Sequence, residues 1–290
     1  MSVNPNFLII GAPKCGTTSL WHELRKHPNV FMPEEKEPAY FNEEYYYFRD
    51  GDRDNWSQYL ARFSEGKQCA AIGEATPGYS LLETAPGTTK RIAEALPEAR
   101  IITIVRHPLK RIESAWHQNV RMGRLPPDTF KDALWKYTPI ISGSKYFRTI
   151  SAYREHFSDE QILVLFLEDL AGRPQQTLDR CFKFLEVEPI AGELDRSGPK
   201  NESKNSRFEL PQLRWFRSLK LWKAGRQLIP DRVKTYARSL FLRPLPSPDW
   251  DEQSLAWTID QVKGDAYKTL EYGGKSSDFW NFSKEVAEWV

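Results

Sequence analysis

The sequence predicts an α/β protein in which a parallel β-sheet lies between two layers of helices, with a further helical part at the C-terminus. Two observations predict this three-layer fold. Apolar runs of strand length occur at Phe7–Ile10, Arg100–Val105 and Ile162–Phe166. Segments with apolar residues at helical spacing separate these runs, and alternating strands and helices are typical of a parallel sheet. The middle run is too apolar for a sheet edge, so we expect a buried parallel strand there.

Length and composition limit the domain organisation. We expect one domain over residues 1–290, with a core at about 5–190 and a closing loop with further helices at about 191–290. Lys and Arg number 41 and Asp and Glu number 39. The resulting net charge of +2 excludes a generally basic nucleic-acid-binding protein, so any anion site must be local.

The cysteines and the apolar runs indicate where the protein resides. Cys15, Cys69 and Cys181 show neither metal-ligand spacing nor a disulfide framework, which indicates a reducing compartment. No apolar run approaches the roughly 18 residues of a membrane span, and no signal peptide is recognisable at the start. We therefore expect a cytoplasmic protein without a transmembrane segment.

A loop built like a phosphate-binding loop follows the first strand. Gly11 and Gly16 bound it, and the pattern G-x-x-x-x-G-T-T is close to the Walker A sequence of nucleoside triphosphatases. Thr17 stands where that pattern has its Lys, and Lys14 lies within the loop instead. A helix beginning at Thr17 would direct free backbone N–H groups and its positive dipole end at one small volume, which suits phosphate or sulfate. The sequence therefore predicts a P-loop-like sheet protein, with a plain glycine turn as the alternative.

The strand at Arg100–Val105 ends differently from the corresponding strand of a Mg²⁺-dependent nucleotidase. A Walker B strand ends in an Asp that holds Mg²⁺, whereas Arg106, His107 and Pro108 follow this one. Pro108 suits the first turn of a helix, which we expect to run to about Met122. The sequence thus predicts a cationic, metal-free site for a nucleotide that carries extra anionic groups.

The remaining elements follow from apolar spacing and from residues that end helices. We expect further helices at 17–27, 88–96, 146–157, 175–185 and 255–270, a strand at 69–73, and a short buried extension at 30–31. A Pro-containing loop should precede the helix at 146–157. Phe279 and Trp280 should pack back on the domain.

Two aromatic segments each allow two interpretations. The aromatic residues within 42–63 either stack on sugar rings at a cleft rim or, as is commoner, pack a lid helix against the core. The basic and aromatic segment 213–243 is either a surface for a membrane or an acidic acceptor, or a helical pair with solvated charges.

The two anion-binding motifs together resemble those of the sulfotransferases that use 3′-phosphoadenosine 5′-phosphosulfate (PAPS). Within that family they are most similar to the heparan sulfate O- and N-sulfotransferases and their bacterial relatives. There, P-K-x-G-T-T is the 5′-phosphosulfate loop, and R-x-P after a strand, followed by a Ser, binds the 3′-phosphate. Residues 13–18 match the first motif, and Arg106, Pro108 and Ser114 match the second. With gaps, the resemblance extends from about Phe7 to the last Trp-rich segment.

The resemblance implies a role for each matching residue. Those that would bind the nucleotide are Lys14, Cys15, Gly16, Thr17, Thr18, Arg106 and Ser114, with Lys204 and Arg207 from a closing segment similar to S-K-G-R. Lys14 would also act in catalysis by following the negative charge on the bridging oxygen. Glu37, in E-P-A-Y-F, stands where the family has its catalytic base. Ala75 replaces an active-site Lys of the heparan sulfate enzymes, so this position does not imply a heparan-like acceptor.

The residues alone leave two kinds of catalytic base open. Burial beside aromatic residues would raise the pKa of Glu37 into a range useful to a base. An ordinary surface carboxylate within the acidic run that contains Glu34 and Glu35 is the alternative for Glu37. His107 and His117 flank the phosphate-binding helix and are the competing bases, although each is more often structural.

The predicted function is transfer of the sulfuryl group of PAPS to a hydroxyl or amino group, with adenosine 3′,5′-bisphosphate as the product and no metal. The resemblance implies a carbohydrate or small glycoconjugate as the acceptor. A P-loop nucleotide kinase and a non-catalytic PAPS- or glycan-binding protein are the alternatives. The missing Walker B acid argues against the kinase. Both motifs occurring together with Glu37 argues against the non-catalytic protein.

Overall fold

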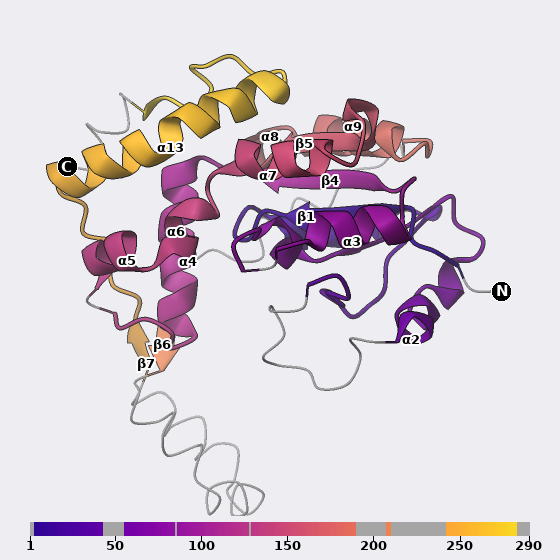
Figure 1. The fold of residues 1–290 in the computed structure, drawn as a ribbon, viewed down its shortest axis with the longest axis horizontal. Coiled ribbons are helices and arrows are strands. Elements are labelled where there is room, and N and C mark those ends of the chain that lie inside the picture. The colour runs from indigo at the N-terminus through magenta and orange to yellow at the C-terminus, as the bar shows by residue number, and fades with distance from the viewer. Residues whose placement is uncertain are drawn as a thin grey trace, which may run out of the picture.

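A five-stranded sheet forms the centre of the molecule (Figure 1). The structure, a computed structural model, describes residues 3–42, 55–84, 86–127, 129–189, 207–209 and 242–282. In spatial order the strands are β2 (Val30–Phe31), β3 (Ala71–Ala75), β1 (Phe7–Gly11), β4 (Arg100–Val105) and β5 (Ile162–Phe166). Every neighbouring pair is parallel, which confirms the predicted parallel sheet and the interior position of β4.

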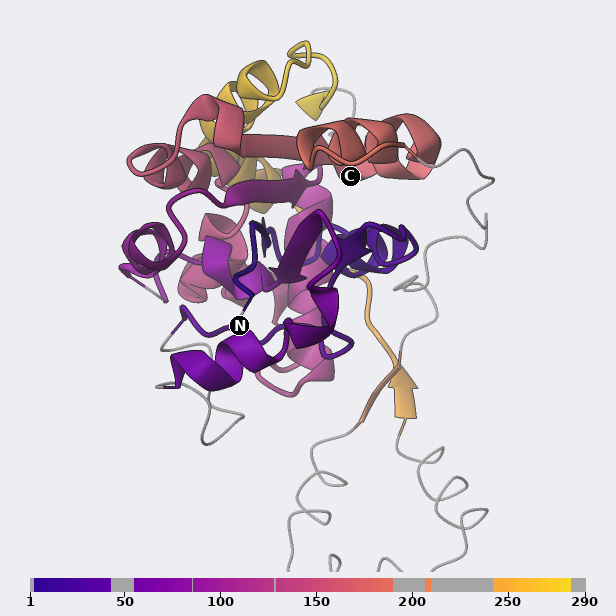
Figure 2. The ribbon, with the colours of Figure 1, turned by 90° about the vertical axis from the view of Figure 1, so that its right-hand side faces the viewer.

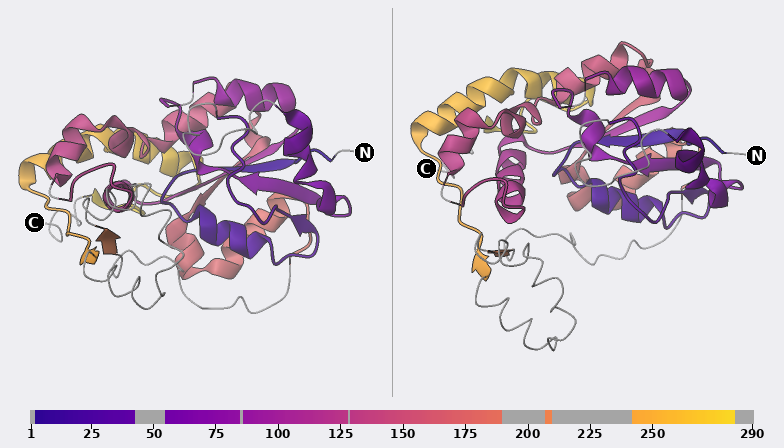
Figure 3. Two further views of the ribbon diagram at one scale, coloured as in Figure 1. Left: turned by 90° about the horizontal axis from the view of Figure 1, so that it is seen from below. Right: turned by 60° about the horizontal axis from the view of Figure 1, so that its bottom comes forward.

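Helices cover both faces of this sheet and give the three layers that the sequence predicts (Figure 3). Phe7 and Ile9 of β1 face one layer, and Leu8 and Ile10 face the other, as the two-residue repeat of a strand requires. The first layer contains α1 (Thr17–Leu24), α8 (Leu167–Gly172) and α9 (Pro174–Phe184). The second contains α2 (Trp56–Ala61), α3 (Thr88–Ala95) and α7 (Tyr146–Arg154), and the short 3₁₀ helices are η1 (Ser64–Gly66), η2 (Pro77–Ser80) and η3 (Asp159–Gln161).

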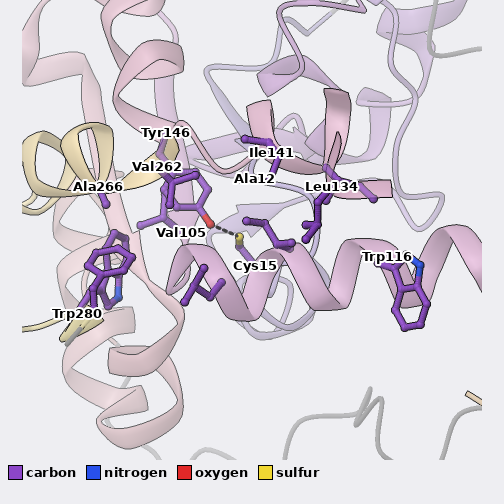
Figure 4. Packing of buried hydrophobic residues seen from close by; sticks show 14 of the residues in the cluster. Ala12, Cys15, Val105, Trp116, Leu134, Ile141, Tyr146, Val262, Ala266 and Trp280 are labelled. Atoms are coloured by element: carbon purple, nitrogen blue, oxygen red, sulfur yellow. Dashed lines mark hydrogen bonds between the residues drawn. The ribbon is translucent and has the colours of Figure 1, made fainter. Parts of the chain in front are cut away.

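A third group of helices packs at the carboxyl end of the sheet. It comprises α4 (Pro108–Arg121), α5 (Phe130–Lys136), α6 (Thr138–Ser142) and α13 (Glu252–Tyr272). α13 lies against α4 and α7 (Figure 2). Cys15 of the first loop and Val105 of β4 share this cluster with Trp280, which is buried as predicted (Figure 4). The loop after β1 is therefore held between the sheet and these helices.

Several elements differ from the sequence-based expectation: α7, for example, ends at Arg154 instead of residue 157, and α13 spans Glu252–Tyr272 instead of 255–270. The strand expected at 69–73 is β3, displaced by two residues, because the carboxyl of Glu74 is hydrogen-bonded inside the fold and belongs to the strand. The expected Pro-containing loop holds α5 and α6, and Pro139 lies in the first turn of α6, where a missing N–H is tolerated. The first helix ends at Leu24 instead of residue 27.

Most of the closing segment, including Lys204, and most of the segment 213–243 lie outside the described residues. The flanking strands β6 (Arg207–Glu209) and β7 (Leu242–Pro244) pair antiparallel. In the aromatic segment, Tyr59 is 2% exposed and its ring stacks on that of Trp56, so these two residues pack α2 against the core. Among the described helices, none has the length and apolar character needed to cross a membrane.

Candidate active site

The segments that follow β1, β2, β3 and β4 meet at the carboxyl end of the sheet. Because β1 lies between β3 and β4, the chain passes across β1 when it goes from one to the other. Open α/β sheets bind ligands in the crevice at such a reversal of strand order. Lys14 follows β1, Glu37 follows β2 and Arg106 follows β4. The topology therefore brings the predicted motifs to one edge of the sheet.

The loop after β1 presents backbone N–H groups at the start of α1. Gly16 has a φ of 93°, in the left-handed region that favours glycine, and it leads the chain into α1. Within the described chain, the amides of Gly16, Thr17 and Thr18 donate to no other residue. These amides and the positive end of the α1 dipole suit a bound anion.

Lys14 lies in this loop among three guanidinium groups. Its pKa is lowered to about 8, first by burial and then by Arg121, with smaller effects of Arg106 and Arg111. The structure thus brings Lys14 and Arg106 together, as the two motifs predict. Sequence reasoning missed Arg121, although it lies seven residues beyond Ser114 on α4 and so on the same helix face. The positive charges of Lys14, Arg106 and Arg121 favour a ligand with several negative charges.

Buried groups behind the loop hold it in place. The Cys15 thiol lies 3.5 Å from the Tyr146 hydroxyl, which donates to the Arg106 carbonyl at 2.8 Å (Figure 4). Burial raises the pKa of Cys15 to about 11, so its side chain is a neutral thiol. Arg111 is 3% exposed and donates from Nε to the Pro13 carbonyl at 3.1 Å. The same guanidinium donates to the Ile140 carbonyl at 2.8 Å, so it ties the loop to α6.

Arg106 and Ser114 belong to one continuous segment at the end of β4. Arg106 is half-buried just before α4 begins, and Ser114 is half-buried two turns into that helix. The Ser114 hydroxyl makes no hydrogen bond to the described part of the chain. A guanidinium and a hydroxyl are thus available on the side of α4 that carries Arg121.

Glu37 lies beside the start of α1. Lys36 Nζ is 2.9 Å from Glu37 Oε1 and 3.4 Å from the hydroxyl oxygen of Thr17. The expected burial of Glu37 is not found, because its side chain is 37% exposed and the rings of Tyr40 and Phe41 pack toward α2 instead. Sequence reasoning missed Lys36, whose side chain is only 14% exposed and which connects Glu37 to the anion-binding loop.

The two histidines are engaged in packing. His107 is 2% exposed between Trp280 and Phe282, and burial lowers its pKa to about 3. His117 Nε2 donates to the Pro246 carbonyl at 3.0 Å, and burial lowers the pKa of His117 as well. The geometry therefore favours Glu37 over either histidine as a proton acceptor.

Three further charged residues complete the description. Glu74, at the end of β3, is 1% exposed, and sequence reasoning gave it no role. Its signal in the sequence is a lone carboxylate inside an otherwise apolar strand. Lys204 lies outside the described residues, and only the backbone of Arg207 is described, within β6.

Comparisons with known proteins identify sulfotransferases as relatives. Mouse carbohydrate sulfotransferase 15 is 26% identical over 265 residues, which cover 70% of this chain and 47% of that protein. Mouse bifunctional heparan sulfate N-deacetylase/N-sulfotransferase 4 is 27% identical over 203 residues, which cover 64% of this chain and 22% of that protein. The chain thus matches about half, or less, of the length of these relatives.

The fold is shared with a sulfotransferase of known structure. The crystal structure of a sulfotransferase from Alicyclobacillus acidocaldarius superposes with a TM-score of 0.59 at 28% identity, over 74% of this chain and 90% of that one. The family model that describes the sulfotransferase domain matches residues 4–209, which contain the whole sheet and both anion-binding motifs. The chain therefore belongs to the sulfotransferase domain family.

Proposed function

We propose that this protein transfers the sulfuryl group of PAPS to a hydroxyl or amino group of a carbohydrate-containing acceptor, without a metal ion. The observation that carries the proposal is the grouping of Lys14, Arg106 and Arg121 beside the free amides of the loop. PAPS carries a 5′-phosphosulfate and a 3′-phosphate, and this cationic site offers a partner for each. Membership of the sulfotransferase domain family supports the same donor.

The two ends of the nucleotide would meet different residues. The amides of Gly16, Thr17 and Thr18, with the two threonine hydroxyls, suit the 5′-phosphosulfate. Arg106 suits the 3′-phosphate because its planar guanidinium forms paired hydrogen bonds and stays charged, and Ser114 adds a hydroxyl. Cys15 would contribute through its backbone, since its thiol is neutral and buried. Lys204 and Arg207 remain proposed contacts from the closing segment.

Lys14 and Glu37 would have different roles in the transfer step. The acceptor oxygen or nitrogen forms a bond to sulfur while the bond from sulfur to the bridging phosphate oxygen breaks. The acceptor proton passes to the Glu37 carboxylate, and the electron pair of the broken bond stays on the phosphate of adenosine 3′,5′-bisphosphate. Lys14 would stabilise that developing charge, because an ammonium group in a half-buried site acts strongly on a nearby anion. The ion pair with Lys36 keeps Glu37 beside the loop that would hold the sulfuryl group.

The names of the relatives support the proposed class of acceptor. The names of two of them specify carbohydrate and heparan sulfate as the molecules sulfated. Ala75 leaves this chain without the lysine that the heparan sulfate enzymes carry at that position, so a less acidic carbohydrate is the acceptor we propose. A nucleotide kinase is the less favoured function, since Arg106 stands where a Mg²⁺-binding acid would be required.

Replacing Glu37 by Gln tests the proposed base. The amide keeps the shape of the side chain but cannot accept the proton, so turnover should fall by about 10²–10⁴. The affinity for PAPS should stay within about threefold of the wild type, because the nucleotide contacts are intact. Transfer of labelled sulfate to desulfated heparin and desulfated chondroitin measures the effect.

Glu34→Gln is the matched control for this experiment. Glu34 is an exposed member of the same acidic run, so its neutralisation changes the net charge equally without touching the site. Turnover should remain near the wild-type value. Equal losses in the two variants, or near-normal turnover in Glu37→Gln, would remove Glu37 from the mechanism.

A further inference from the structure

Glu74 is a buried carboxyl group whose partners are all hydroxyls. It pairs with Leu8 in the sheet register and is 1% exposed. Tyr79 donates to Oε1 at 2.7 Å, Tyr59 donates to Oε1 at 3.2 Å, and Thr76 donates to Oε2 at 2.5 Å. No Lys or Arg within the described ranges forms a salt bridge with it. Burying a carboxyl away from cations costs free energy, which its hydrogen bonds offset. A buried polar network whose members are all hydrogen-bonded makes its surroundings rigid.

Two of the three hydroxyls also accept hydrogen bonds from the segment that contains Glu37. A hydroxyl that gives its only proton to Glu74 turns its lone pairs elsewhere and can then only accept. The Thr76 oxygen accepts from the Ala39 amide at 3.2 Å, and the Tyr79 oxygen accepts from the Phe41 amide at 3.4 Å. Because a backbone amide can only donate, these two bonds need a free lone pair on each hydroxyl, and Glu74 holds the hydroxyls in the orientation that provides it.

The segment held in this way has a backbone that needs support. Glu37 has a φ of 65° and Ala39 has a φ of 49°, both in the left-handed region that side chains disfavour. Such residues persist only where their surroundings hold them. Further bonds on the same segment come from Asn42, which donates to the Gly78 carbonyl at 3.0 Å, and from Thr88, which donates to the Phe41 carbonyl at 3.2 Å. Arg91 also donates to the Phe41 carbonyl, at 2.7 Å. Among these bonds to the backbone of the segment, the Thr76 bond to Ala39 lies nearest to Glu37 in the chain.

We propose that Glu74 is a positioning residue that acts through Thr76 and Tyr79 to hold Glu37 beside the anion-binding loop. The inference rests on the proposed function, in which Glu37 accepts the acceptor's proton. The position of Glu37 would then be set by a carboxyl inside the sheet, and this carboxyl would contact neither PAPS nor the carbohydrate acceptor.

Tyr59 provides a matched control for Tyr79. Both hydroxyls donate to the same oxygen of Glu74, and both rings are buried. Only the Tyr79 hydroxyl also accepts a backbone amide from the segment of Glu37. Tyr79→Phe and Tyr59→Phe therefore each remove one hydrogen bond to Oε1 of Glu74. Only Tyr79→Phe also removes the acceptor of the Phe41 amide. Thr76→Val cuts the connection to Ala39 with little change of shape.

Hydrogen exchange tests the anchoring without any acceptor. In the full-length protein, the Phe41 amide should exchange at least about tenfold faster in Tyr79→Phe than in Tyr59→Phe. The Ala39 amide should respond in the same way to Thr76→Val. Equal exchange of the Phe41 amide in the two tyrosine variants overturns the inference.

Turnover tests whether the anchoring acts through Glu37. Tyr79→Phe and Thr76→Val should each lower kcat by about tenfold to a hundredfold, as expected for a misplaced catalytic group, and leave the Kd for adenosine 3′,5′-bisphosphate unchanged. In a Glu37→Gln background the same substitutions should have almost no further effect on kcat. An equal loss in both backgrounds overturns the positioning role. Full turnover of Glu37→Gln itself would instead refute the proposed base, and the exchange rates would then decide alone whether Glu74 holds the segment.

Discussion

Single residues at the strand ends determine the charge of this site. Arg106 follows β4 where a nucleotidase would have a Mg²⁺-binding acid, and with Lys14 it makes the crevice cationic. Glu74, near the end of β3, which β1 separates from β4, is a carboxyl kept out of water, and no Lys or Arg of the described residues forms a salt bridge with it. Both residues lie at the carboxyl ends of parallel strands, yet Arg106 borders the proposed nucleotide site and Glu74 is surrounded by hydroxyls. Their environments therefore predict different responses to substitution.

Replacing Arg106 by Ala should weaken binding of adenosine 3′,5′-bisphosphate by about 2–4 kcal/mol, because a charge-assisted pair with the 3′-phosphate is lost. Binding of adenosine 5′-phosphosulfate, which lacks that phosphate, should barely change. Calorimetry with both nucleotides in the presence of EDTA makes the comparison. Equal losses for the two nucleotides would show that Arg106 does not distinguish the 3′-phosphate.

Glu74 should make stability depend on pH. Burial raises its pKa in the folded protein from 4.5 to about 7, so the folded state binds a proton more tightly than the unfolded state does. Between pH 4.5 and about 7, Glu74 is mostly ionised in the unfolded state and mostly protonated in the folded state. The free energy of unfolding should therefore fall as the pH rises through this range, by up to about 3 kcal/mol. Urea unfolding of the wild type relative to Glu74→Gln, measured from pH 4.5 to 7, tests this prediction. A difference that stays constant or grows with pH would contradict it.

Whole elements were predicted where hydrophobic periodicity dominates. β1, β4 and β5 are short apolar runs, and α3, α4, α7 and α9 carry apolar stripes, so their positions follow from burial alone. β3 was misplaced because Glu74 is charged in the sequence, whereas its hydroxyl partners lie elsewhere in the chain. α5 and α6 were missed because short helices that are stabilised by tertiary packing leave little periodic signal.

The close packing of β3 against β1 predicts the effect of a substitution at Gly73 on stability. A Cβ on Gly73 would lie 2.4 Å from the Phe7 carbonyl oxygen of β1, and backbone atoms within a sheet cannot move aside easily. Gly73→Ala should therefore destabilise the protein by at least about 1–3 kcal/mol in urea unfolding. Gly264→Ala, in the middle of α13 with nothing within 4 Å of the added Cβ, is the control and should stabilise it by about 0.5–1 kcal/mol. A neutral Gly73→Ala would show that β3 packs less closely than described.

The molecule as a whole connects sequence segments that no local pattern relates. The two motifs of the site were predicted because each is contiguous in the chain, and the sheet order brings Lys14 and Arg106 together. Lys36 and the network around Glu74 were not predicted, since their roles depend on which distant residues lie beside them. Trp280 and Phe282, close to the end of the chain, cover His107 in the second motif. The C-terminal part thus supports the site from outside the sheet.

Transfer of label from PAPS to a carbohydrate distinguishes a sulfotransferase from a nucleotide kinase. With EDTA present, PAPS labelled on sulfur should pass its label to desulfated heparin or desulfated chondroitin, and Glu37→Gln should abolish most of that transfer. With Mg²⁺ present, ATP labelled on its γ-phosphorus should pass none. Phosphorus label on the acceptor, with the sulfur label remaining on the nucleotide, would contradict sulfuryl transfer and establish a kinase.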